Sequence, residues 1–144
     1  MPAESAYVDT SVLGAYYCAE PLSDAAEAAL ARTGAPLISA LCEVEFTSLI
    51  ARKQRLGELS EAQARDRLAL LRLHIAEGVF GRVPISAGHY LRAAELIAAM
   101  GSPLRTLDAL HLAVAIAADL PLITADREFA TSARRHGTEV VLVA

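Results

Sequence analysis

The sequence contains no tryptophan, a single lysine and few aromatic residues. Aromatic side chains make up 5% of the 144 residues, so a surface that binds nucleic-acid bases by stacking them on a row of rings is not expected. The two cysteines, Cys18 and Cys42, match no CxxC spacing, and we expect two buried thiols in a reducing compartment. Neither a P-loop nor a GxGxxG motif is present, which excludes the nucleotide-driven enzymes that use them.

Long apolar runs and a secretory signal are also missing. The longest apolar region, residues 109–125, is interrupted by His111, Asp119 and Pro121, so we expect no membrane span and a cytoplasmic protein. The formal net charge of −4 argues weakly against a nucleic-acid binder driven by overall charge. With 54% hydrophobic and 21% charged residues, the chain is not disordered, and its length predicts one domain over residues 1–144.

Short apolar strands alternate with longer helical segments along the chain. Strands that are wholly apolar and separated by helices indicate a parallel sheet covered on both faces. The sequence therefore predicts a three-layer α/β/α domain with a central, mainly parallel sheet. The expected strands are 6–8, 37–38, 79–83, 122–124 and 140–143, and the expected helices are 24–32, 40–55, 60–74, 86–100, 107–117 and 126–135.

Four carboxylates lie where an apolar segment gives no structural reason for a charge: Asp9, Glu45, Asp108 and Asp126. Asp9 and Asp126 each end a predicted strand, and ligands of open parallel sheets bind at the carboxyl ends of the strands. Glu45 and Asp108 lie on apolar rows of two predicted helices. Because burying an ionised carboxylate without a partner is costly, the four acids suggest a shared cation.

Each acid also has an ordinary structural explanation. Asp9 and Asp126 could cap the helices that follow them, and Asp108 lies in the first turn of a helix, where a negative charge is favourable. Glu45 is harder to explain, because it lies mid-helix on the expected buried face without a basic residue three or four positions away. Glu43 is rotated by roughly 200° from Glu45, and we expect it to face solvent.

Oxygen ligands without His or Cys spacing favour Mg²⁺ or Mn²⁺ over Zn²⁺. Such ions can activate a water molecule and offset charge on a leaving oxygen, so hydrolysis at a phosphate is the predicted reaction class. His111 lies on the same side of its helix as Asp108; a ligand role stays open, and a packed histidine is favoured. A haloacid-dehalogenase-type phosphatase needs an Asp where Ser11 stands, and a receiver domain needs a late lysine, which Lys53 is not.

The four acids lie in four short segments: 7–11 (YVDTS), 39–45 (SALCEVE), 104–113 (LRTLDALHLA) and 122–127 (LITADR). In this order and spacing the segments resemble the PIN-domain family, and more narrowly the VapC toxins of bacterial toxin–antitoxin pairs. The resemblance implies a Mg²⁺- or Mn²⁺-dependent endoribonuclease that forms a homodimer and is neutralised by a cognate VapB-like antitoxin. A housekeeping PIN ribonuclease, and a PIN-fold module that binds RNA or protein without toxin activity, remain the alternatives.

The resemblance also assigns roles to residues by position. It implies that Asp9, Glu45, Asp108 and Asp126 form the catalytic, metal-binding acidic quartet.

Four further residues are expected to bind substrate or orient water. Thr10 or Ser11 would hydrogen-bond a metal-bound water or an acidic neighbour, and Thr124 would orient Asp126 or a substrate phosphate. Arg105 adjoins Asp108 in sequence; it would contact an RNA phosphate or balance a carboxylate.

Overall fold

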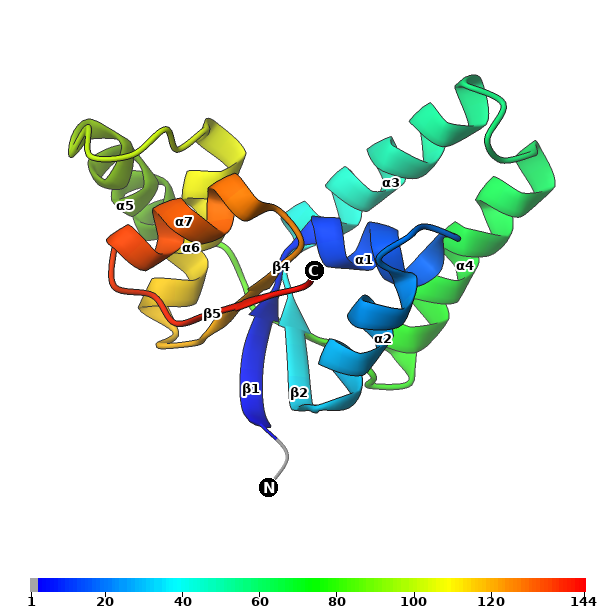
Figure 1. Cartoon of the computed structure of the whole chain (residues 1–144), viewed down its shortest axis with the longest axis horizontal. Helices are drawn as coiled ribbons and strands as arrows, with labels where there is room; N and C mark the ends of the chain where they lie inside the picture. Colours follow the sequence, from blue (N-terminus) through cyan, green and yellow to red (C-terminus); the bar gives the residue numbers. More distant parts are fainter. Residues whose placement is uncertain (1–2) are drawn as a thin grey trace.

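The computed structural model describes residues 3–144, so residues 1 and 2 of the expected domain lie outside the described part. Within residues 3–144, five strands form one sheet in the order β3-β2-β1-β4-β5, and every neighbouring pair is parallel (Figure 1). The expected parallel sheet is confirmed. Its strands are β1 (Ala3–Val8), β2 (Thr33–Ile38), β3 (Gly81–Arg82), β4 (Leu122–Thr124) and β5 (Val140–Leu142).

Seven helices within the described residues cover this sheet, which confirms the three-layer α/β/α architecture. Helices α1 to α4 gather on one side of the central strands and α5 to α7 on the other (Figure 1). The helices are α1 (Thr10–Tyr17), α2 (Ser23–Ala31), α3 (Ala40–Arg55), α4 (Glu61–Ala76), α5 (Ala87–Ala98), α6 (Thr106–Ala117) and α7 (Arg127–Arg135).

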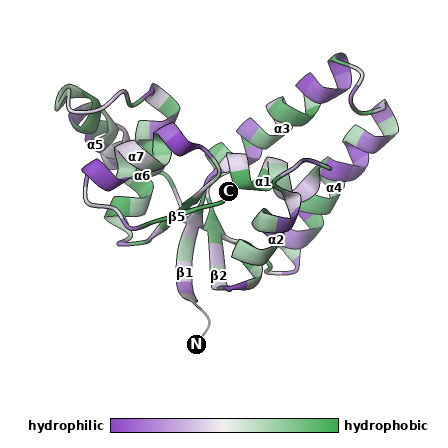
Figure 2. Cartoon of the chain, in the orientation of Figure 1, coloured by the Kyte–Doolittle hydropathy of each residue, from purple (hydrophilic) through white to green (hydrophobic). Residues whose placement is uncertain are grey.

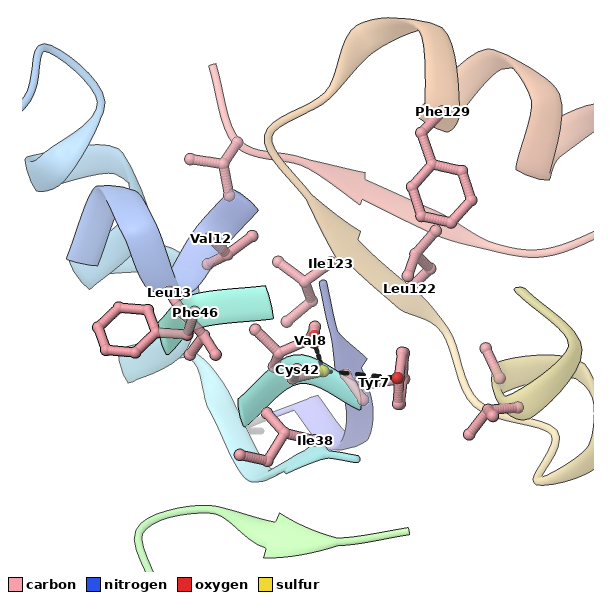
Figure 3. Packing of buried hydrophobic residues seen from close by; sticks show 14 of the residues in the cluster. Tyr7, Val8, Val12, Leu13, Ile38, Cys42, Phe46, Leu122, Ile123 and Phe129 are labelled. Atoms are coloured by element: carbon pink, nitrogen blue, oxygen red, sulfur yellow. Dashed lines mark hydrogen bonds between the residues drawn. The ribbon is translucent and has the colours of Figure 1, made fainter. Parts of the chain in front are cut away.

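Strand β1 is central in the sheet, and its composition follows from that place. Tyr7 and Val8 are fully buried, and so is Leu122 of the neighbouring strand β4. Glu4, near the start of β1, is exposed. The end of β1 is apolar at successive positions, without the alternation of a half-exposed strand, as expected where helices cover a parallel strand on both faces. Figure 3 shows these side chains packed with Phe46 of α3 and Phe129 of α7, so the core joins both groups of helices to the sheet.

Helix α3 buries one row of side chains at a spacing of four residues: Cys42, Phe46 and Ile50. The neighbouring row, which includes Glu45, is only half-buried. The expectation that Glu45 lies on the buried face is therefore corrected: it lies beside that face, at its boundary. Hydrophilic and hydrophobic segments alternate along α3 and α4 in Figure 2, as expected for helices with one covered side.

The structure corrects several element boundaries. Helix α1 was not expected, β2 begins four residues before the predicted 37–38, and β3 is shorter than the predicted 79–83. The apolar stripe on α4 is core: Leu71 is 3% exposed, and Leu68 and Ile75 pack against the core cluster. Both cysteines are buried and free, as expected.

Candidate active site

The sheet topology brings two of the four acids to one edge. Strands β1 and β4 are parallel neighbours, with Val8 paired to Ile123, so their carboxyl ends lie side by side. Asp9 follows the first strand directly, and its backbone N–H donates to the Ile123 carbonyl at 2.9 Å. Asp126 lies two residues beyond the end of β4. This is the edge at which open parallel sheets bind their ligands.

Two hydroxyl groups hold the Asp9 carboxylate, which is only 6% exposed. Ser11 Oγ donates to Oδ2 of Asp9 at 2.7 Å, and Thr124 Oγ1 donates to the same oxygen at 2.9 Å. The same hydroxyls accept backbone N–H groups of Ala125 and Asp126 at 3.0 and 3.1 Å. The two strand ends are thus tied together through the acid, and the second oxygen, Oδ1, stays free of these bonds.

Close packing of α1 on α3 places Thr10 against Glu45. A Cβ atom on Gly14 would lie 2.7 Å from Leu49 Cδ2, so a glycine at this position lets the two helices approach. One turn earlier on both helices, Thr10 Oγ1 donates to Glu45 Oε1 at 2.9 Å. Of the two partners predicted for Thr10, the structure shows the acidic neighbour.

Glu45 has a second partner in His111, whose Nε2 is hydrogen-bonded to Oε1 of the same carboxylate. Burial alone would raise the pKa of Glu45, but the bonds from His111 and Thr10 outweigh it and lower that pKa. Burial would likewise lower the pKa of His111, yet its neighbours Cys42, Glu45 and Asp9 raise it to about 10. Both shifts act in the same sense, because each favours the charged form of its group, the carboxylate of Glu45 and the imidazolium of His111.

Asp108 and Asp126 share one basic neighbour, Arg105. The guanidinium lies between them, with Nε 3.7 Å from Asp108 Oδ2 and one terminal nitrogen 3.7 Å from Asp126 Oδ2. The Arg105 side chain is 73% exposed, so it can leave this place at little cost. Asp126 also caps α7, because its Oδ1 accepts the Phe129 N–H at 3.0 Å; the ordinary structural role applies to it as well.

The carboxylates are close enough to affect one another's charge. Burial, followed by repulsion from Asp9 and Asp126, raises the pKa of Asp108 from 3.8 to about 6. Its neighbours Glu45 and Arg105 line a hollow of ≈ 460 Å³ together with Asp108 itself. Two of the four acids therefore line an accessible hollow, and the other two lie near enough to Asp108 that an approaching cation would relieve repulsion.

A divalent cation fits this donor set in its chemistry. Carboxylate oxygens are the ligands that Mg²⁺ and Mn²⁺ prefer, and Asp108 and Asp126 already direct oxygens toward one positive group, Arg105. Within residues 3–144, no three or more His, Cys, Asp or Glu side chains are gathered closely enough to form a metal site. The four acids thus lie near one another without converging on one point.

Sequence reasoning placed Glu43 outside this group, and in the structure it faces a different neighbour. Its carboxylate accepts two bonds from Arg82, from Nε at 2.9 Å and from a terminal nitrogen at 2.6 Å. It is half-buried by this pair. The partner of Glu45, in contrast, was missed, because Glu45 and His111 are 66 positions apart. The burial of His111 was expected; its contact with an acid was not.

A model of the PIN domain family matches residues 6–135, so this chain belongs to the PIN domain family. No curated protein matches the chain significantly. In residues 3–144, no helix combines the length and the apolar character needed to cross a bilayer.

Several solved structures share the fold. The VapC20 toxin of Mycobacterium tuberculosis, described as cleaving the sarcin–ricin loop, matches with a TM-score of 0.69 and 19% identity, over 88% of this chain and 93% of that one. A VapBC2 complex of Rickettsia felis bound to promoter DNA matches with a TM-score of 0.70 and 16% identity, over 97% of this chain and 99% of that one. A toxin–antitoxin complex of Klebsiella pneumoniae matches with a TM-score of 0.66 and 22% identity, over 96% of this chain and 98% of that one. At these identities the likeness concerns the fold.

Proposed function

We propose that this chain is a metal-dependent endoribonuclease of the VapC kind, with Asp9, Glu45, Asp108 and Asp126 holding Mg²⁺ or Mn²⁺. The observation that carries the proposal is that two basic side chains link the four acids in pairs in a PIN-domain chain: Arg105 lies 3.7 Å from both Asp108 and Asp126, and His111 Nε2 contacts Glu45 and lies 3.9 Å from Asp9 Oδ1. The raised pKa of Asp108 supports it, because excess negative charge at one place favours a bound cation.

The reaction would be hydrolysis of an RNA phosphodiester by water. When bound, the cation would lower the pKa of the attacking water and offset the charge that develops on the leaving oxygen. Ser11 and Thr124 hold Oδ2 of Asp9, and Oδ1, which lies 3.9 Å from His111 Nε2, would be the ligand atom. Arg105 would leave Asp108 and Asp126 and contact a phosphate of the RNA, which its exposed side chain allows.

RNA cleavage in vitro tests this activity. Purified protein should cleave structured RNA with Mg²⁺ or Mn²⁺ and stop when a chelator is added. Asp9→Asn should abolish cleavage, whereas Glu43→Gln should leave it unchanged, because Glu43 pairs with Arg82 outside the acidic group. RNA that stays intact under both metals would refute the enzyme hypothesis. Full activity of Asp9→Asn would refute the assigned site.

We further propose a toxin role in the cytoplasm, with a VapB-like antitoxin as partner and a homodimer as the active form. Support comes from fold neighbours that were solved as toxin–antitoxin complexes. Expression of the chain alone should arrest growth, and co-expression of a cognate antitoxin should restore it. Harmless expression of protein that cleaves RNA in vitro would favour a housekeeping ribonuclease, and harmless expression of inactive protein a binding module.

A further inference from the structure

His111 is buried to 1% exposure, and both of its ring nitrogens are engaged by protein groups. Nδ1 is hydrogen-bonded to the Tyr7 hydroxyl at 2.6 Å, and Nε2 to the Glu45 carboxylate. A histidine that ligates a metal needs one ring nitrogen with a free lone pair. His111 offers none, so the ligand role that the sequence left open is not available to it in this arrangement.

The hydrogen bonds continue behind the histidine. The Tyr7 hydroxyl also lies 2.7 Å from Ser39 Oγ and 3.5 Å from Cys42 Sγ, and the contact with Cys42 is drawn in Figure 3. Tyr7, Ser39 and Cys42 are all fully buried. A buried hydrogen-bonded chain of this kind restricts each member to one position, because any member that moves leaves an unpaired polar group.

This chain of bonds forms a closed path through the elements that carry the acids. It starts at Ser39, which precedes α3, crosses β1 at Tyr7 and α6 at His111, and returns to α3 at Glu45. The strand of Tyr7 leads to Asp9, and Asp108 lies on α6 one turn before His111. The path therefore connects Glu45 to the elements that position Asp9 and Asp108.

We infer that His111 is a positioning residue, whose Nε2–H holds the Glu45 carboxylate at the acidic hollow while Tyr7 fixes the imidazole ring. The inference rests on the proposed metal-dependent function. It differs from a packing role in one requirement, namely a hydrogen-bond donor at the outer end of residue 111. A packed side chain needs only the volume of the ring.

Two amide variants separate these roles. In His111→Gln the amide nitrogen lies near the place of Nε2 and can donate to Glu45, whereas in His111→Asn it lies near Nδ1 and reaches only Tyr7. Binding of Mn²⁺ to metal-free protein should be measured by titration calorimetry, next to RNA cleavage as a function of Mn²⁺. We expect a roughly 10- to 100-fold larger Kd for the asparagine variant, as for other lost partners of metal ligands. The glutamine variant should stay within a few-fold of wild type.

Tyr7→Phe and His136→Gln complete the set. The first removes the anchor of the ring and should raise the Kd for Mn²⁺ by a smaller factor than His111→Asn. His136 contacts Ser102, at 3.3 Å, and its replacement should leave the Kd unchanged. Thermal unfolding in chelator should show that each variant is folded before its affinity is compared.

The outcomes keep the inference and the proposed function apart. Equal Mn²⁺ affinity in wild type and His111→Asn would overturn the positioning role and leave the nuclease proposal intact. Equally weakened binding by the Gln and Asn variants would also overturn it, because a donor at the outer end would then not matter. Wild-type protein that neither binds Mn²⁺ nor cleaves RNA would refute the proposed function itself.

Discussion

Replacement of Asp108 by asparagine should stabilise the metal-free protein at neutral pH while abolishing RNA cleavage. The reason is burial of the ionised carboxylate together with charge crowding: burial, followed by repulsion from Asp9 and Asp126, raises the pKa of Asp108 from 3.8 to about 6. In the folded protein its ionised form is therefore less favourable than in the unfolded chain. Asparagine keeps the shape of the side chain and removes the charge.

The size of the effect follows from the two pKa values. A rise from 3.8 to about 6 means that ionising Asp108 costs the folded state about 3 kcal/mol at high pH. The favourable contact with Arg105 is already contained in this pKa, but the amide must still be desolvated. We therefore expect a net gain of about 1–2 kcal/mol, or roughly 3–6 °C in Tm for a domain of this size.

The gain should depend on pH in a defined direction. Because the folded-state pKa is the higher one, the penalty is absent below pH 3.8, grows as pH rises toward about 6, and is complete above it. At about pH 5 the folded protein keeps most of the proton and the ionisation penalty is roughly half of its full size. The net advantage of asparagine should therefore be about 1 kcal/mol smaller than at about pH 7.5.

Thermal unfolding in chelator at both pH values measures the gain in stability of Asp108→Asn over wild type, with Asp66→Asn as the matched control. Asp66 is exposed on α4, so its replacement changes the net charge equally without touching the acidic group. A lower Tm for Asp108→Asn at neutral pH would refute the reasoning. So would a gain of equal size at both pH values, because charge crowding requires ionised Asp108.

Three smaller effects are expected elsewhere. Asp126→Ala should destabilise the protein by about 1 kcal/mol, because the cap on the Phe129 N–H is lost. Asp126→Asn should keep the cap and lose only cleavage. Equal Tm values for the two variants would contradict the capping role. Arg82→Gln should barely change Tm and leave RNA cleavage intact, because its pair with Glu43 is exposed; impaired cleavage would assign this pair to the site. Ser60→Ala should cost about 1 kcal/mol, since Ser60 caps α4; an unchanged urea midpoint would show that the cap is dispensable.

The sequence predicted helices and strands best where the hydrophobic periodicity agreed with the capping residues at the ends of a segment. Helix α3 was expected at residues 40–55 and is found at Ala40–Arg55, because Ser39 precedes it and its buried residues recur every four positions. Helix α1 was missed, because most of its residues are buried, which removes the amphipathic pattern. Its Gly14 and β-branched or aromatic residues also disfavour a helix in isolation.

The sequence identified the acids but not the groups that hold them. Residues 9 and 124 are hydrogen-bonded across 115 positions, and residues 45 and 111 across 66. Periodicity describes neighbours on one element only, so contacts of this range follow from the fold and cannot be seen in the pattern. Thr124 was expected to act on Asp126 or a phosphate; its hydroxyl contacts the Asp126 backbone and, in addition, the carboxylate of Asp9.

The strand order also limits when the acidic group can exist during synthesis of the chain. Strand β1 emerges first, yet both of its partners, β2 and β4, are made later. Asp9 obtains its bond from Thr124 only after more than four-fifths of the 144 residues have been joined. A nascent chain that ends before β4 contains the first three acids without the arrangement that unites them. Any activity of this group therefore requires that the chain has been made as far as β4 and Asp126.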